Sequence, residues 1–178
     1  MNLKETITKE LLLDLINASL AELYTKDHYL IDNSPIDWGD KDGKHYVGER
    51  AIVFRFAHYL LSNIEKMNVD PDLSLDCEYN RNGCLNKALP SFPRGVIPDV
   101  IIHKRGSNDK NVLVMEFKTY GNDNQENDED KIREITDPQG KYKYAYGITV
   151  LLKSNEAIIK VFENGKENDN KIVNAFML

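Results

Sequence analysis

The sequence predicts an α/β fold of the mixed α+β kind, with a central mixed β-sheet flanked by helices. Two amphipathic helical stretches come first, and short strands with alternating apolar residues follow them. A third helical stretch interrupts the strands near an Asp-Pro pair. With 178 residues, the chain is long enough for one domain with a substantial core.

Both early helices are predicted from the spacing of their apolar residues. Residues 4–24 and about 49–67 repeat such residues at steps of three to five, which is typical of a helix with one buried face. Between them, residues 25–47 contain Pro35, Trp38 and several Gly and Asp residues, which favours a long connection. The expected buried positions are Ile7, Leu11, Leu15, Ala18 and Leu23 in the first helix, and Ile52, Val53, Phe56, Leu60, Ile64 and Met67 in the second.

A run of short strands is predicted next. Apolar and polar residues alternate over 73–79, which indicates a half-buried strand, and we expect Cys77 in it to be a buried thiol. Residues 82–95 contain two prolines and a glycine and are predicted to form a loop.

A β-hairpin is predicted over residues 96–119. Pro98 lacks an N–H group, so the strand 96–103 either occupies a sheet edge or begins near this residue. The polar run 104–111 has the composition of a hairpin turn, and N-V-L-V-M-E-F-K-T, residues 111–119, is the returning strand.

The last third of the chain starts with an acidic segment. Residues 121–130 hold five acids and no base, which predicts a solvated loop, and a short helix is expected at about 128–136. Asp137 and Pro138 should end this helix. A further strand and a terminal hairpin are expected at 144–152, 157–162 and 172–176.

We therefore expect a single domain over residues 1–178. It would consist of an N-terminal helix and connection (1–47), a core (48–152) and a C-terminal hairpin (153–178).

Composition excludes several classes of protein. The net charge of −6 and pI near 5.3 argue against a protein that coats nucleic acid non-specifically, although an enzyme with a local basic groove stays possible. No apolar run approaches about 18 residues, so no transmembrane helix is expected. The polar N-terminus and the two cysteines predict a cytoplasmic protein with reduced thiols. The four histidines lack the spacing of a zinc site.

Charged residues on the apolar hairpin strands are the first functional signal. Glu116 and Lys118 share one face of their strand, about 7 Å apart, and Asp99 lies within the apolar run V-I-P-D-V-I-I. A hairpin turn centred near 107–108 places Asp99 close to Glu116 on the neighbouring strand. For the Glu116 and Lys118 pair alone, a solvated strand end is the simplest interpretation.

Two carboxylates on adjacent strands would repel each other unless a cation lies between them. Oxygen ligands of this kind suit Mg²⁺ or Mn²⁺. Glu49, at the start of the second helix and on its buried face, is a third candidate ligand. Considered alone, Glu49 is more simply explained as a partner of the helix dipole.

The order of these residues resembles the PD-(D/E)XK nuclease superfamily. Pro98-Asp99, sixteen further residues and then Glu116-Phe117-Lys118 match its motif, with an inward Glu49 on a preceding helix. The resemblance spans roughly residues 48–152. Four segments are similar to a group of small, uncharacterised bacterial members: D-C-E-Y-N-R (76–81), P-D-V-I-I-H-K-R-G (98–106), L-V-M-E-F-K (113–118), and K-I-R-E-I-T-D-P (131–138) with Y-K-Y (142–144) after it.

The resemblance implies a restriction-endonuclease-like core and a metal-dependent nuclease. Asp99, Glu116 and the Phe117 carbonyl would bind Mg²⁺ or Mn²⁺, and Glu49 would reach the ion directly or through water. Lys118 would lie near the scissile phosphate and help to orient or activate the attacking water.

The substrate is expected to be nucleic acid, with DNA favoured over RNA. Candidate phosphate contacts are Arg81, Arg94, Lys87 and Arg105, although each could equally be an exposed solubilising charge. Tyr142, Tyr144 and Tyr146 could stack on bases, but packing at a sheet edge explains them more simply.

One alternative function stays open at this point. The chain could be a catalytically silent, nuclease-like binding or assembly subunit of a defence or mobile-element system. A two-fold symmetric homodimer is the expected form if the chain self-associates.

Overall fold

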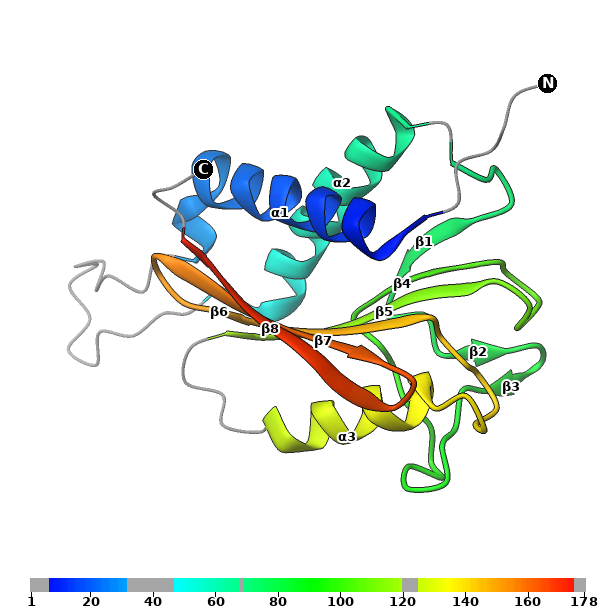
Figure 1. Cartoon of the computed structure of the whole chain (residues 1–178). Helices are drawn as coiled ribbons and strands as arrows, with labels where there is room; N and C mark the ends of the chain where they lie inside the picture. Colours follow the sequence, from blue (N-terminus) through cyan, green and yellow to red (C-terminus); the bar gives the residue numbers. More distant parts are fainter. Residues whose placement is uncertain (1–6, 32–46, 68, 120–124, 175–178) are drawn as a thin grey trace.

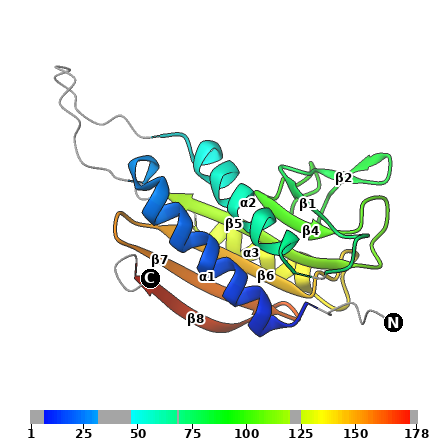
Figure 2. The same ribbon diagram turned by 90° about the horizontal axis from the view of Figure 1, so that it is seen from above.

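The computed structural model describes residues 7–31, 47–67, 69–119 and 125–174. A six-stranded mixed sheet separates two helices on one face from a third helix on the other (Figures 1 and 2). The helices are α1 (Lys9–Lys26), the short 3₁₀ turn η1 (His28–Leu30), α2 (Glu49–Glu65) and α3 (Gln125–Thr136). The α/β mixed fold predicted from the sequence is therefore present.

The main sheet has the strand order β1-β4-β5-β6-β7-β8. Only β5 and β6 pair in parallel, because α3 crosses between them, and the other neighbouring pairs are antiparallel. The strands are β1 (Ser74–Cys77), β4 (Val100–His103), β5 (Asn111–Thr119), β6 (Tyr146–Leu152), β7 (Glu156–Glu163) and β8 (Lys166–Asn174), with a separate two-stranded hairpin of β2 (Arg81–Asn82) and β3 (Leu85–Asn86).

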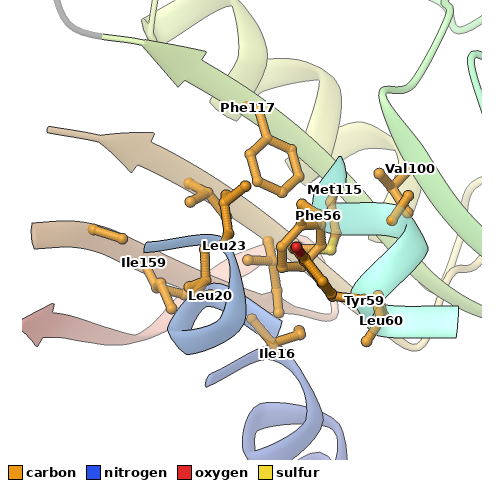
Figure 3. Close-up of a cluster of buried hydrophobic side chains, with 14 of the residues drawn as sticks. Ile16, Leu20, Leu23, Phe56, Tyr59, Leu60, Val100, Met115, Phe117 and Ile159 are labelled. Carbon is orange, nitrogen blue, oxygen red and sulfur yellow. The ribbon is translucent and has the colours of Figure 1, made fainter. Parts of the chain in front are cut away.

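Two apolar clusters hold the layers together. The larger one packs α1 and α2 against the sheet, and Figure 3 shows Phe56 of α2 beside Phe117 of β5, with ring centroids 4.9 Å apart. The smaller cluster packs α3 on the opposite face and contains Ile101 and Val114. Successive residues of β5 therefore face opposite layers, as the predicted alternation requires.

Several predicted boundaries differ from the structure. The helix α3 begins at Gln125, so residues 125–130 are helical rather than part of an acidic loop. Strand β4 begins at Val100, two residues after Pro98 and four later than the predicted start at Val96. It lies between β1 and β5, so the predicted edge position is wrong. The polar run after β7 is mostly strand, because Asn164 and Gly165 close a tight turn at φ values of 53° and 74°.

Some side chains are also placed differently. Cys77 is exposed, not a buried thiol, and Ala18 lies on the exposed side of α1. The predicted loop 82–95 contains part of the β2–β3 hairpin. Predicted features at residues 4–6, 32–46, 120–124 and 175–176 lie outside the described residues. Among the described helices, none has the length and apolar character needed to cross a membrane.

Candidate active site

The predicted carboxylates lie together at one end of the central strands. Val100 of β4 pairs with Met115 of β5, and the next position along this antiparallel register places Asp99 opposite Glu116. A carboxylate oxygen of Asp99 accepts a 2.7 Å hydrogen bond from the Phe117 backbone N–H. The two acids therefore come from neighbouring segments and share the face of the sheet that α3 covers.

Glu116 is the most buried member of this pair, with 5% of its surface exposed. Burial raises its pKa well above the usual value, and the negative charge of Asp99 raises it further. The ammonium group of Lys131 lies 3.7 Å from a Glu116 oxygen and opposes this rise. Glu116 is thus a desolvated carboxyl group whose ionised form a nearby cation would favour.

Asp99 is perturbed in the same direction. Burial raises its pKa to about 6, the Phe117 N–H group opposes this shift, and the charge of Glu49 adds to it. Two neighbouring acids with raised pKa values are a common feature of functional sites. Here both pKa values are raised by burial and by the negative charge of a neighbouring acid.

Lys118 lies at the centre of a small ion network. Its Nζ atom is 2.8 Å from Asp128 and 3.6 Å from Glu49, and it donates a 3.1 Å hydrogen bond to the Phe117 carbonyl. Burial acts to lower the pKa of Lys118, but the hydrogen bond that it donates to Asp128 and the charges of the surrounding acids outweigh this effect, so the net shift is upward. The side chain therefore stays an ammonium group at neutral pH.

Glu49 reaches this cluster from the opposite layer. It is the first residue of α2, and its second carboxylate oxygen accepts a 3.2 Å hydrogen bond from the Thr119 backbone N–H. A role limited to the helix dipole does not account for this contact with the end of β5.

Two further residues of the cluster were missed in the sequence. Asp128 is 3% exposed, and the Lys131 ammonium group lies 2.5 Å from its other oxygen. Asp128 lay where the predicted acidic loop 121–130 overlaps the helix expected at about 128–136, and neither residue was considered for the site. The available signal was helical spacing: Asp128 precedes the buried Ile132 and Ile135 by four and seven residues and so shares their inward face.

A cavity of about 240 Å³ opens beside the cluster. Glu116, Lys118 and Asp128 form part of its wall. Across the sheet, a row of paired positions continues from Glu116 through residues of β6, β7 and β8, namely Thr149, Lys160 and Asn170. The carboxylates of Glu116 and Asp128 thus face a cavity that a ligand could enter over the α3 face.

The oxygen atoms of this cluster suit a small, hard cation that keeps several water ligands, and not an ion bound by protein ligands alone. Within the described residues, no three Asp, Glu, His or Cys side chains are arranged to hold a metal. Mg²⁺, however, is commonly held by one or two carboxylates with water completing its octahedron. Asp99 and Glu116 meet that requirement, and the Phe117 carbonyl, which accepts a hydrogen bond from Lys118, is the backbone oxygen that the resemblance adds to them.

The proposed phosphate contacts do not join this cluster. Arg105 follows β4 at the strand end opposite Asp99, and its guanidinium group is bound to Asp76. Arg81 is exposed on the β2–β3 hairpin, Arg94 is exposed in the loop before β4, and Lys87 is buried. In the described part of the chain, none of the four contacts a carboxylate of the cluster.

The tyrosines are used for packing. Tyr142 and Tyr144 are each 1% exposed and belong to the smaller apolar cluster, which leaves neither ring free to stack on a base.

Comparison with protein-family models, characterised proteins and solved structures gave no match for this chain.

Proposed function

We propose that the chain is a metal-dependent phosphodiester hydrolase of the endonuclease type that acts on DNA. The observation that carries this proposal is the position of Asp99 opposite Glu116 on neighbouring segments, beside a cavity that Glu116 and Lys118 line. Lys118 also contacts Glu49 at 3.6 Å. Helix α2, the β4–β5 hairpin, α3 and β6 also follow in the order that the resemblance to PD-(D/E)XK nucleases implies.

Asp99 and Glu116 would hold Mg²⁺ or Mn²⁺, together with the Phe117 carbonyl. Glu49 would contribute directly or through a water molecule. The bound ion would supply the Lewis acidity that lowers the pKa of an attacking water and stabilises the charge developing on phosphorus.

Lys118 would act next to these ligands. Because Asp128 and Glu49 keep its ammonium group charged and fix its position, it can orient the water and donate to a phosphate oxygen. Asp128 and Lys131 are positioning residues in this proposal, since they act through Lys118 and Glu116.

The test is cleavage of linear, supercoiled and single-stranded DNA, and of RNA, with Mg²⁺ or Mn²⁺. We expect Asp99→Asn and Lys118→Met to lower the rate by about 100-fold or more, as for other preorganised electrostatic groups. Asp72→Asn, an exposed acid paired with Lys104, is the matched control and should retain full activity. Equal activity in all variants would identify a contaminant and refute the proposal.

A silent binding or assembly subunit is the second candidate. It is favoured by one observation: the ammonium groups of Lys118 and Lys131 already neutralise part of the acidic cluster. Calorimetric titration with Mn²⁺ separates the two, since a folded protein with no affinity below the millimolar range would support the silent subunit.

The proposal also covers the cellular compartment and the oligomeric state of the chain. Two exposed, unpaired cysteines, Cys77 and Cys84, fit a reducing cytoplasm. A homodimer would match the two strands of a DNA duplex, and sedimentation of the purified chain tests this part.

A further inference from the structure

A second pocket lies at the other end of the sheet from the carboxylate cluster. It is formed where the turn between β4 and β5 meets the β2–β3 hairpin, and these segments lie side by side in Figures 1 and 2. Asn108 of the turn donates a 3.1 Å hydrogen bond to Asn82 of the hairpin and so joins the two walls. The volume of this second pocket is about 180 Å³. We call it the lysine pocket, after Lys87.

Lys87 is the central feature of this pocket. It is 2% exposed, yet it lines the cavity. Its Nζ atom donates a 2.8 Å hydrogen bond to the Tyr144 hydroxyl, and three tyrosine rings surround it at 5.0 to 6.0 Å, those of Tyr79, Tyr142 and Tyr144. An ammonium group has three donors, and the described residues provide a hydrogen-bond acceptor for one of them.

No acid neutralises this ammonium group within the described part of the chain. Asp76, which contacts the pocket residue His103 at 3.0 Å, is already bound to the guanidinium group of Arg105. Burial lowers the pKa of His103, so its ring is uncharged at neutral pH. Arg81 contributes a second positive charge at the exposed side of the pocket.

A buried, unpaired ammonium group is costly unless a ligand compensates it. Burial lowers the pKa of Lys87 to about 8, which is the expected response of an amine without an anionic partner. In a chain with a net charge of −6, a pocket with two cations and two free donors is unusual. These features favour an anion with several acceptor oxygens.

We propose that the lysine pocket binds a phosphate group, with the Lys87 ammonium group donating to it from the base and Arg81 from the rim. Pockets for drug-sized molecules span roughly 300 to 1,000 Å³. The smaller volume here fits the phosphate group itself, carried either by a free phosphate compound or by the 5′ end of a nucleic acid.

The experiment is calorimetric titration of the full chain with three probes, in EDTA so that metal binding plays no part. The probes are inorganic phosphate, a short 5′-phosphorylated oligonucleotide and the same oligonucleotide with a 5′-hydroxyl group. Saturable binding of inorganic phosphate alone identifies a free phosphate compound as the ligand. Preference for the phosphorylated oligonucleotide over its hydroxyl form identifies a nucleic-acid end.

Three variants complete the design. Lys87→Met keeps the apolar stem and should weaken binding at least about tenfold, the loss expected for a charge-assisted hydrogen bond. Arg81→Gln, at an exposed position, should weaken it several-fold even if Lys87→Met fails to fold. Lys166→Met, an exposed lysine of β8, should bind like the parent chain. Failure of all three probes to bind, or parental affinity in folded Lys87→Met or in Arg81→Gln, would overturn the proposal.

Discussion

Replacing Asp99 with Asn should stabilise the metal-free protein at alkaline pH. Burial raises the pKa of Asp99 from its usual value of 3.8 to about 6, and a shift of this size corresponds to about 3 kcal/mol. Because the raised pKa means that the folded state binds more protons than the unfolded state, stability falls as the pH rises from about 4 through 6. Above about pH 7 the full penalty is present.

Asparagine removes this penalty with little change in shape. Its side-chain oxygen can still accept the hydrogen bond from the Phe117 N–H group. Since Asp99 keeps some contact with solvent, we expect a gain of about 2 kcal/mol at pH 8, or roughly 4 to 8 °C in Tm for a domain of this size. At pH 4 the gain should vanish.

Thermal unfolding in EDTA at pH 4, 6 and 8 measures this effect. Asp72→Asn is the control, because the hydrogen bond and charge of Lys104 lower the pKa of Asp72. Removing the Asp72 carboxylate should therefore bring no gain in stability at pH 8. The reasoning would be refuted if Asp99→Asn were less stable than the parent chain at pH 8, or if the difference did not depend on pH.

Three further substitutions test the surroundings of the site by chemical denaturation. Gly147→Ala would place a methyl group 2.4 Å from a side-chain methyl of α3, and we expect the free energy of unfolding to fall by about 1 to 3 kcal/mol. Parental stability would contradict the close packing of α3 on β6. Lys131→Met should destabilise the fold more at pH 8 than at pH 5, since Glu116 is more often neutral at low pH; an equal loss at both would contradict the ion network. Phe117→Ala should cost about 3 to 5 kcal/mol, and a cost under about 1 kcal/mol would contradict its burial against Phe56.

Local patterns were enough to predict most elements of the fold. The stripe through Phe56 and Leu60 defined α2, and the turn chemistry after His103 joined β4 and β5 in the observed register. The start of α3 was missed, because a run of acids resembles a solvated loop and only the packing of its inward face shows that it is helical.

The site was predicted in part, for a related reason. Asp99, Glu116 and Lys118 lie on one hairpin, so strand alternation and register were sufficient to bring them together. Asp128 joins from α3, the next element along the chain, and its burial depends on how α3 docks on the sheet. Lys87 was predicted to be either a phosphate contact or an exposed charge in a loop, and only the fold shows that it is buried among three tyrosine rings.

Crystals soaked in Mn²⁺ provide the most direct measurement of the central claim, through the anomalous signal of the ion. We expect one peak in contact with carboxylate oxygens of both Asp99 and Glu116, and we expect that peak to be absent from crystals of Asp99→Asn. Crystals that take up no Mn²⁺ at this point, with Glu116 still beside the Lys131 ammonium group, would contradict it.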